Sequence, residues 1–288
     1  TVSVTVTVAD AAGNTASCTT SFTAVDTTAP IVTTCPTSQT VSASATCDAI
    51  LPEFTSEVVA TDNVTAAGSL VITQVPVAGT VVAKGTTNVT VTVADAAGNT
   101  STCAVVYQVN DTTAPQITVC APSQTVSADT NCGFLVPNFV AGSTATDNCA
   151  VTSFTQAPAA GSTVSVGITT VTLTATDAAG NSATCVATLT VNDTTVPTIS
   201  AAATHTVTLA SPCIGTLGDL TTLATAADNC TTVTVTQSPL ATATVVPGTV
   251  TVTLTATDSA GLTATTTVTV TVSGSGAPSA TYADDDWS

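Results

Sequence analysis

The sequence predicts an all-β protein built of tandem immunoglobulin-like β-sandwiches in an elongated rod. The first observation is a repeated segment, Val-Thr-Val-Ala-Asp-Ala-Ala-Gly-Asn, which occurs at 6–14 and 91–99 and has close variants at 173–181 and 254–262. The second is the alternation of hydroxyl and aliphatic residues around it, which is typical of strands with one face in a core. The third is the recurrence of turn signals about every 8–12 residues, as in a sandwich of about seven short strands.

The period of the repeat predicts the domain organisation. Asp95 and Asp177 are 82 residues apart, and Asp177 and Asp258 are 81 residues apart. Joints of sequence Asp-Thr-Thr-(Ala/Val)-Pro separate the repeats, and because they are short and contain proline, they favour a stiff rod. We expect a partial domain that keeps only its C-terminal strands at 1–26, full domains at 30–111, 115–193 and 197–273, the last of them divergent, and a linker with an acidic tail at 274–288. The partial domain predicts a window from a longer chain, with a hairpin that completes a neighbouring molecule as the alternative.

Each element follows from local chemistry. The alternating stretches 3–8, 89–93, 171–176 and 250–257 are predicted strands, with valines facing the core and hydroxyl residues facing water. Asp-Ala-Ala-Gly-Asn is the hairpin turn that follows, because aspartate suits the first turn position and glycine supplies a positive φ. The next strand runs through 103–109 in the first repeat and 185–191 in the second. The expected large core residues are Phe54, Phe134, Phe139 and Phe154.

The charge balance excludes several classes of partner. The chain has 18 acidic residues against a single basic one, and its net charge is −17 at pH 7. Such a chain is a poor partner for nucleic acid and for anionic membranes, and its carboxylates need a counter-charge from sodium or from divalent cations. No run of about twenty apolar residues exists, so we expect no membrane span in this segment.

The ten cysteines include no Cys-x-x-Cys pair, which favours disulfides and an oxidising location. The second repeat contains four cysteines and the third keeps only the inner two, so the two outer cysteines are expected to pair with each other. The predicted disulfides are Cys35–Cys103, Cys120–Cys185, Cys132–Cys149 and Cys213–Cys230. Cys18 and Cys47 are left unpaired or intermolecular, because Val64 stands where Cys47 would find its partner. A Cys18–Cys47 bridge is the open alternative.

Several motifs of the second repeat together resemble a known family. Ile-x-x-Cys at 117–120 is followed by Ala-Thr-Asp-Asn-Cys at 145–149, by Ala-Thr-Asp-Ala-Ala-Gly-Asn-x-Ala-Thr-Cys at 175–185 and by a closing Asp-Thr-x-x-Pro. This order resembles hyalin repeat (HYR) domains, which are immunoglobulin-like modules of extracellular and bacterial surface proteins. The resemblance extends to about residue 273 and is weakest in the third repeat, where Leu262 replaces asparagine. It implies adhesion or structural spacing and no catalysis.

Ten aspartates fall at only three positions of the repeat and form the candidate calcium site. They are Asp10, Asp95, Asp177 and Asp258 at the start of the hairpin turn, Asp62, Asp147 and Asp228 in the Asp-Asn motif, and Asp26, Asp111 and Asp193 at the start of the joints. Alternate loops of a sandwich lie at the same end, so these positions can converge. With the turn asparagines Asn14, Asn99 and Asn181 they offer the oxygen ligands that calcium takes. Aspartate and asparagine are also ordinary turn residues, and that interpretation stays open.

The other chemically reactive residues have ordinary interpretations. His205 lies in an alternating strand without a nucleophile elbow, and Lys84 is a loop charge. Glu53 and Glu57 lack the aromatic-lined cleft of a glycosidase. Asn-x-Thr sequences and outward threonines offer glycan sites. The tail 282–288 is either a disordered end or a docking peptide.

We therefore predict no enzyme. The favoured function is that of a secreted, extracellular or cell-surface structural protein, a stalk or filament-forming segment stabilised by disulfides and calcium. It would self-associate or continue into further repeats. The alternative is an adhesin whose loops bind a carbohydrate or a protein. The loops are alike from repeat to repeat, which favours the scaffold over ligand recognition.

Overall fold

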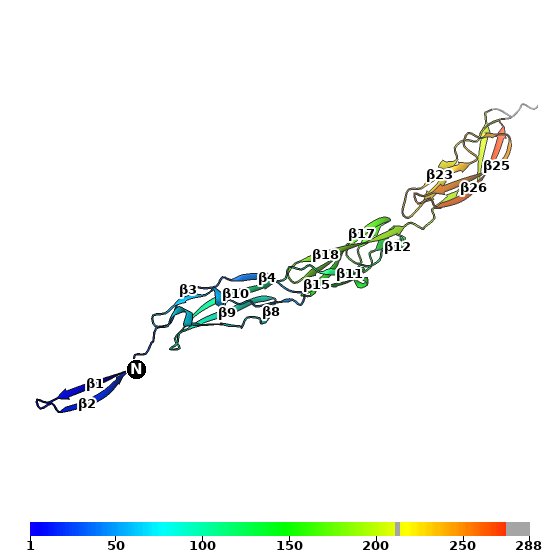
Figure 1. The fold of residues 1–288 in the computed structure, drawn as a ribbon. Coiled ribbons are helices and arrows are strands. Elements are labelled where there is room, and N and C mark those ends of the chain that lie inside the picture. Colours follow the sequence, from blue (N-terminus) through cyan, green and yellow to red (C-terminus); the bar gives the residue numbers. More distant parts are fainter. Residues whose placement is uncertain (211–213, 275–288) are drawn as a thin grey trace, which may run out of the picture. The chain divides into compact units, whose positions relative to one another are not determined.

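The computed structural model describes residues 1–210 and 214–274 (Figure 1). Regular structure in these ranges is β apart from four short 3-10 helices, η1 (Thr55–Glu57), η2 (Ala67–Ser69), η3 (Val140–Gly142) and η4 (Thr221–Leu223). None of these helices has the length and apolar character needed to cross a bilayer. The predicted class of tandem immunoglobulin-like all-β domains is confirmed.

The N-terminal hairpin consists of β1 (Val2–Ala9) and β2 (Thr15–Phe22), paired antiparallel. We predicted that the valines of 3–8 face a core, but Val4 and Val6 are 44% and 54% exposed. The reason is that β1 and β2 form a sheet of their own, with every residue exposed on both faces.

The first full repeat contains eight strands in three sheets. A four-stranded sheet has the order β4-β10-β9-β7, in which β4 and β10 are parallel, and the pairs β3-β6 and β5-β8 form the other two sheets. The strands are β3 (Ile31–Thr34), β4 (Gln39–Ser42), β5 (Asp48–Ile50), β6 (Val59–Thr61), β7 (Val71–Val75), β8 (Val81–Ala83), β9 (Gly85–Ala94) and β10 (Thr100–Asn110).

The second and third repeats keep this topology. Their four-stranded sheets have the orders β12-β18-β17-β15 and β20-β26-β25-β23, again with a parallel first pair. The strands of the second repeat are β11 (Gln116–Val119), β12 (Gln124–Ser127), β13 (Gly133–Leu135), β14 (Thr144–Thr146), β15 (Val151–Ala157), β16 (Thr163–Ser165), β17 (Gly167–Asp177) and β18 (Ser182–Asn192). Those of the third are β19 (Thr198–Ala201), β20 (Thr204–Leu209), β21 (Gly215–Thr216), β22 (Ala224–Ala227), β23 (Thr234–Ser238), β24 (Thr244–Val245), β25 (Gly248–Thr257) and β26 (Thr263–Gly274).

The cores follow the predicted period of two. Val89, Val91 and Val93 on β9 are all 0% exposed, and the threonines between them face outward or are partly covered. Phe54 and Phe139 are also 0% exposed. Equivalent buried sets are Val171, Leu173 and Ala175 in the second repeat and Val252, Leu254 and Ala256 in the third. The other two predicted core residues, Phe134 and Phe154, are only partly buried.

In each full repeat one glutamine side chain forms hydrogen bonds to three backbone groups next to the core, a contact that was not predicted from the sequence. In the first repeat the buried Gln74 accepts a hydrogen bond from the N–H of Phe54 (2.7 Å) and donates to the carbonyls of Pro52 (3.1 Å) and Pro76 (3.3 Å). Gln156 and Gln237 make the same three kinds of contact in the other repeats. The glutamine therefore satisfies three backbone groups that no strand pairing satisfies.

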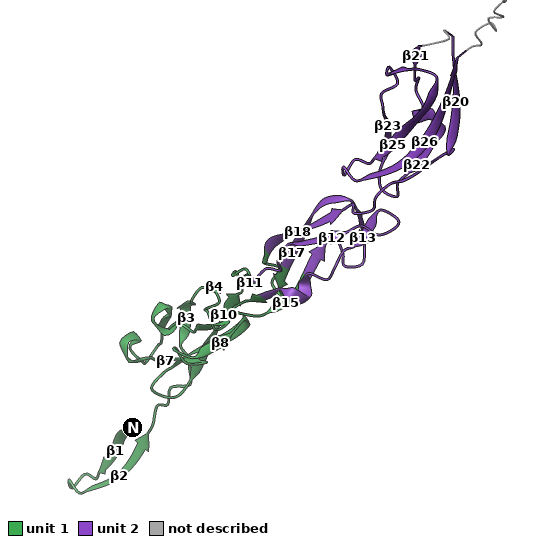
Figure 2. Cartoon of the chain, turned by 90° about the vertical axis from the view of Figure 1, so that its right-hand side faces the viewer, with its two compact units in different colours: residues 1–118, 145–154, 175–183 green, residues 119–144, 155–174, 184–288 purple. Residues whose placement is uncertain are grey.

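By its contacts the chain divides into two compact units (Figure 2). One comprises residues 1–118, 145–154 and 175–183, and the other comprises residues 119–144, 155–174 and 184–288. The candidate aspartates from residue 10 to residue 177 all belong to the first unit, and those from residue 193 onward all belong to the second.

Candidate metal sites

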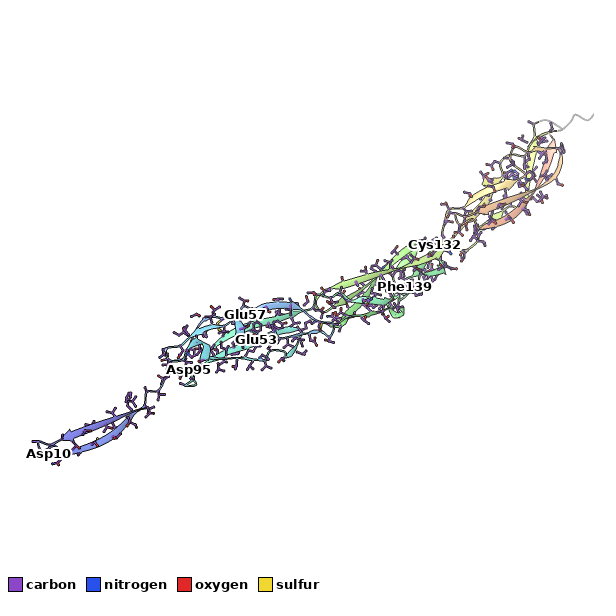
Figure 3. All side chains as sticks on the ribbon, viewed as in Figure 1. Asp10, Glu53, Glu57, Asp95, Cys132 and Phe139 are labelled. Atoms are coloured by element: carbon purple, nitrogen blue, oxygen red, sulfur yellow. A yellow bond between two sulfur atoms is a disulfide. The ribbon has the colours of Figure 1, made fainter. Side chains whose placement is uncertain are left out.

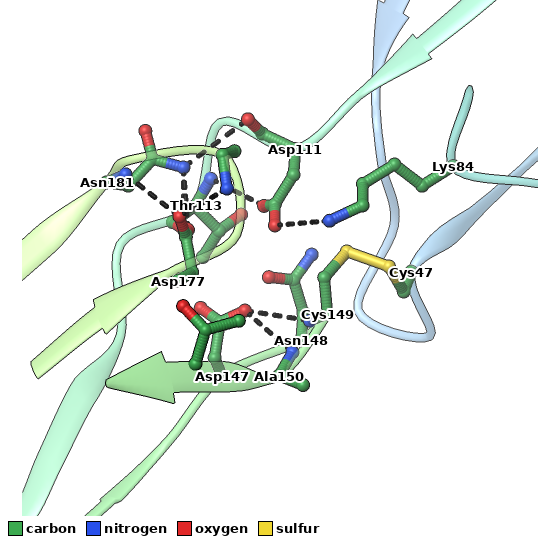
Figure 4. Close-up of polar contacts among 12 residues, drawn as sticks. Cys47, Lys84, Asp111, Thr113, Asp147, Asn148, Cys149, Ala150, Asp177 and Asn181 are labelled. Carbon is green, nitrogen blue, oxygen red and sulfur yellow. Dashed lines mark hydrogen bonds and ion pairs between the residues drawn. A yellow bond between two sulfur atoms is a disulfide. The ribbon is translucent and has the colours of Figure 1, made fainter. Parts of the chain in front are cut away.

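The turn aspartates are fixed by their own hairpins. Asp177 Oδ1 accepts hydrogen bonds from the N–H groups of Ala179 (2.8 Å) and Asn181 (2.9 Å), and its Oδ2 accepts one from Asn181 Nδ2 (2.8 Å) (Figure 4). Gly180 completes the turn at a φ of +92°, which glycine adopts without strain. The same bonds occur at Asp10 with Asn14 and at Asp95 with Asn99.

These hydrogen bonds keep the turn carboxylates ionised. Desolvation by burial has the largest effect on the pKa of Asp177 and raises it, but the bonds from Asn181 and from the turn backbone together outweigh burial and lower the pKa below 3.8. The pKa of Asp95 is lowered by the same balance. At the exposed Asp10, the side-chain bond from Asn14 is the main cause of the lowered pKa. Each of these three turns therefore contributes a negative charge at neutral pH.

The aspartates of the Asp-Asn motif use one carboxylate oxygen and leave the other without a hydrogen bond. Asp147 Oδ2 accepts from the N–H groups of Cys149 (2.8 Å) and Ala150 (3.1 Å), which closes the loop after β14. Asp147 Oδ1 is buried and has no hydrogen-bond partner. Asp62 and Asp228 show the same division.

The joint aspartates also use one carboxylate oxygen for a hydrogen bond and leave the other without one. Asp111 Oδ1 accepts from the N–H of Thr113 (3.2 Å), while its Oδ2 is buried without a hydrogen bond. Asp26 and Asp193 accept from the N–H two residues on, and Oδ2 of each is likewise buried and unpartnered. Asp111 and Asp193 are only 6% and 8% exposed. A buried carboxylate oxygen without a partner is costly, so its recurrence at equivalent positions suits a site for a cation.

The three kinds of aspartate converge, as the repeat pattern predicts. In each of two clusters, carboxylate oxygens of three aspartates lie within 4.8 Å of one another. The first cluster is Asp26, Asp62 and Asp95, and the second is Asp111, Asp147 and Asp177. Each cluster combines a joint with the two loops of the repeat that follows it. The hairpin turn at Asp10 belongs to no such cluster among the described residues.

The third cluster is built differently. Asp193 and Asp228 form a group with the sulfur of Cys230, but this cysteine is in a disulfide and provides no thiolate ligand. Asp258, the turn aspartate of this repeat, is not in the group. Because Leu262 replaces the turn asparagine and donates only its N–H to Asp258 Oδ1 (2.8 Å), Asp258 Oδ2 is buried without a partner.

The asparagines of the hairpin turns and those of the Asp-Asn motif make different contacts. Asn181 Nδ2 donates to Asp177 and to the carbonyls of Asp111 and Thr113 (3.3 Å to each carbonyl), so calcium binding by the turn asparagines, through Oδ1, stays a prediction. Asn148 and Asn229 were not among the predicted ligands, yet their Oδ1 atoms are buried and have no hydrogen-bond partner. The signal was available, because both directly follow an aspartate of the Asp-Asn motif.

The donor set fits a hard cation. Carboxylate and amide oxygens are the ligands that calcium takes, and it accepts six to eight of them. Three carboxylates within 4.8 Å also repel one another unless a positive charge lies between them. The clusters of described residues contain no histidine and no free thiol, so the donor set does not suit zinc.

The disulfides correct part of the predicted pairing. Cys35–Cys103 and Cys120–Cys185 are present, with Cα–Cα distances of 5.8 and 6.2 Å. Cys132–Cys149 is wrong, because Cys149 pairs with Cys47 and Cys132 pairs with Cys230. The predicted Cys213–Cys230 is therefore wrong too, and Cys47 is not unpaired.

Hydrogen bonds between loops explain the corrected pairing. Asn148 Nδ2 donates to the Ser44 carbonyl (2.8 Å), which brings Cys149 beside Cys47 (Figure 4). Asn229 Nδ2 donates in the same way to the Asp129 carbonyl (3.1 Å). The Cys47–Cys149 and Cys132–Cys230 disulfides therefore join one repeat to the next. In each of them one cysteine lies two residues after an aspartate of the Asp-Asn motif.

The remaining candidates lie outside the clusters, with one exception. Glu53 and Glu57 are exposed (Figure 3), and His205 is a half-buried residue of β20. Cys18 is exposed and in no disulfide of the described chain. The exception is Lys84, predicted to be a loop charge, whose Nζ lies 3.5 Å from Asp111 Oδ2. Cys213 and the tail at 282–288 lie outside the described residues.

The turn asparagine of the second cluster gives a test of local stability. Replacement of Asn181 by leucine should lower the free energy of unfolding by about 1–3 kcal/mol, because a buried oxygen of Asp177 and two backbone carbonyls lose their donor. Calorimetry in the presence of a chelator measures this loss. Asn14→Leu is the matched control, since Asn14 bonds only to the exposed Asp10, and its effect should stay below about 0.5 kcal/mol. Equal losses in the two variants would contradict the assigned role.

Comparison with known proteins gives one family and a set of distant structures. The sequence model of the HYR domain family matches residues 25–109 and 110–191. No curated protein matches the sequence. Similar solved structures include PcdhgB3 EC1-4, with 14% identity over 96% of this chain and 84% of that chain and a TM-score of 0.35. Mouse cadherin-23 EC22-24 is 17% identical over 86% of this chain and 99% of that chain, with a TM-score of 0.35. Each of the two family matches contains one whole cluster of three aspartates.

Proposed function

Because the chain belongs to the HYR domain family, we propose that it is an extracellular structural repeat protein, a surface stalk or filament-forming segment that binds calcium at its aspartate clusters. The observation that carries this proposal is the recurrence of buried carboxylate oxygens without a hydrogen bond at equivalent positions of all three clusters, of which only Asp111 Oδ2 has a basic neighbour. Aspartates of the joints and of the Asp-Asn motif without a metal role would have no reason to leave the same oxygens without hydrogen bonds in every repeat.

Calcium would neutralise the negative charge that remains in each cluster. In the second cluster, Asp111 Oδ2 and Asp147 Oδ1 are the oxygens free to bind it, while Asn181 and the turn backbone fix the position of Asp177. Ligands from a joint and from two loops would then be tied to one ion, which stiffens the joint. The chain's large negative charge makes such neutralisation favourable for close packing of these loops.

The disulfides support a location outside the reducing cytosol. The described chain contains Cys35–Cys103, Cys47–Cys149, Cys120–Cys185 and Cys132–Cys230, and such bonds persist in oxidising compartments. Two of them join successive repeats at the clusters. Covalent and metal-mediated connections at the same joints suit a protein that carries mechanical load.

Calcium should raise the melting temperature of the chelator-treated protein by several degrees. If calcium is present at about 100 times its dissociation constant, linkage adds about 2.7 kcal/mol per site to the free energy of unfolding. Calorimetry with calcium, and with sodium chloride at equal ionic strength, separates specific binding from screening. An unchanged melting temperature would contradict the proposal.

Matched variants locate the effect. Asp26→Asn combined with Asp62→Asn removes two ligands of the first cluster and should reduce the calcium-induced shift. Asp219→Asn removes a charge from an exposed aspartate outside all the clusters and should leave that shift unchanged. Equal shifts in both proteins would mean that calcium acts through general screening.

Assembly is tested separately from metal binding. Negative-stain microscopy and sedimentation at high protein concentration, with and without calcium, should show filaments or end-to-end oligomers. Monomers under both conditions would contradict filament formation and leave an adhesive stalk as the function. Binding of a carbohydrate or protein by the monomer would then support the adhesin alternative.

A further inference from the structure

The single basic side chain of the protein lies in the second cluster. The sequence contains one Lys or Arg residue against 18 acidic ones. The Nζ atom of this residue, Lys84, lies 3.5 Å from Asp111 Oδ2, and the two side chains are 32% and 0% exposed (Figure 4). Asp111 Oδ2 is buried without a hydrogen bond, as are the equivalent oxygens of the joint aspartates in the other two clusters. The ammonium group therefore occupies the approach to a proposed calcium ligand.

The backbone of the second cluster positions this lysine. The N–H of Lys84 donates to the carbonyl of Cys47 (3.1 Å), and Cys47 is bonded to Cys149 beside Asp147. The next residue, Gly85, has a φ of +127° and begins β9. The backbone of Lys84 is thus joined by a hydrogen bond to Cys47, and the disulfide of Cys47 holds this segment close to the loop of Asp147.

The next repeat places an apolar residue at the same position. Val166 precedes Gly167, which has the same φ of +127° as Gly85. Val166 and Asp193 line one cavity of about 540 Å³, as Lys84 and Asp111 line one of about 400 Å³. The two positions therefore differ in one side chain and one charge, while the backbone and the neighbouring aspartate are retained.

We propose that Lys84 is a built-in counter-charge that weakens calcium binding at the second cluster, so that the clusters of the chain fill at different calcium concentrations. This inference rests on the proposed function and adds a rule that sets the affinity. With Lys84 the second cluster carries three negative charges and one positive charge, whereas the first cluster carries three negative charges and has no basic neighbour, because the chain contains no other Lys or Arg. A divalent ion must therefore displace or repel the ammonium group to reach Asp111.

The test compares calcium affinity with and without the lysine. In a background of Asp26→Asn and Asp193→Asn, which weakens the first and third clusters, isothermal titration with calcium chloride reports mainly on the second. Lys84→Gln in this background should tighten binding about tenfold or more, because repulsion between an ammonium group and a divalent ion is removed. The reciprocal change, Val166→Lys in the otherwise unmodified chain, should weaken one class of sites by a comparable factor.

A second measurement separates this role from an ordinary ion pair. In chelator, Lys84→Gln should lower the melting temperature, since Asp111 loses its only counter-charge, and saturating calcium should reverse the loss. An ion pair with a purely structural role predicts the same loss with and without calcium. If the unmodified chain binds calcium but Lys84→Gln leaves the affinity unchanged, the inference about Lys84 is wrong and the proposed function stands. If the unmodified chain binds no calcium, both are wrong.

Discussion

The Phe54→Ala variant should lose about 3–5 kcal/mol of the free energy of unfolding of the first repeat. Phe54 is 0% exposed and packs in a cluster with Val89, Val91 and Tyr107, whose ring lies edge-on at a centroid distance of 6.4 Å. Alanine removes these contacts and leaves a cavity, because a close-packed core restrained by the Cys35–Cys103 disulfide cannot fully collapse around the gap. Calorimetry measures the loss, and hydrogen exchange followed by mass spectrometry assigns it to this repeat.

Phe22→Ala is the control for this variant. Phe22 is 66% exposed on the N-terminal hairpin, so the same chemical change should alter stability by less than about 0.5 kcal/mol. Comparable losses in the two variants would mean that the hairpin is covered in solution. A loss below about 1 kcal/mol at Phe54 would contradict the assigned core.

The parts of the fold that the sequence predicted are those set by local chemistry. The alternation of Val89, Val91 and Val93 fixes which face of β9 is buried, because successive side chains of a strand point to opposite faces. The turn from Asp95 to Asn99 is likewise set locally, since the hydrogen bonds that the Asp95 carboxylate accepts connect residues at most four positions apart. The repeated spacing then places equivalent turns at equivalent ends, which is why convergence of the aspartates could be predicted.

The disulfide pairing between repeats was out of reach of that reasoning. Comparison of repeats assumed that each one closes its own bonds, but the loop of Cys149 contacts the loop of Cys47 in the preceding repeat. One signal did exist, because Val64 leaves Cys47 without a partner in its own repeat. A pairing shifted by one repeat removes that inconsistency. The choice between the two schemes depends on contacts that no local pattern encodes.

The supporting glutamines were missed for another reason. Gln74, Gln156 and Gln237 each stand two residues before a proline at the same position of the repeat, which is visible in the sequence. The predicted strands did not include these positions, and no role was assigned to the glutamines. In the structure the glutamine side chain instead serves backbone groups at the start of the 3-10 helix, such as the N–H of Phe54. Only the position of the 3-10 helix reveals this partner.

Removal of the Cys47–Cys149 disulfide should have an effect as large as that of the core substitution. The bond spans 102 residues of sequence, and the chain-entropy model assigns about 4–5 kcal/mol to closure of such a loop. The double variant Cys47→Ser with Cys149→Ser avoids a stray thiol, and calorimetry measures its lower stability. Cys18→Ser, at an exposed cysteine without a disulfide in the described chain, is the control and should change stability by less than about 0.5 kcal/mol.

Peptide mapping of the unmodified protein without reductant should yield a Cys47–Cys149 peptide, and a Cys132–Cys149 peptide would overturn the pairing.

The same double variant should also weaken calcium binding at the second cluster. Cys149 lies two residues from Asp147, and its N–H is a donor to Asp147 Oδ2, so the disulfide fixes the loop that carries this ligand. Without it, calcium would have to order the loop on binding, and the affinity should fall.

Cys35→Ser with Cys103→Ser provides the matched comparison, because it removes a disulfide that lies within one repeat and adjoins no cluster aspartate. Titrations below the melting temperature of both variants should show weaker binding only when Cys47–Cys149 is absent. Equal weakening in the two variants would show that global stability sets the affinity, and no weakening in either would show that the loop keeps its position without the bond.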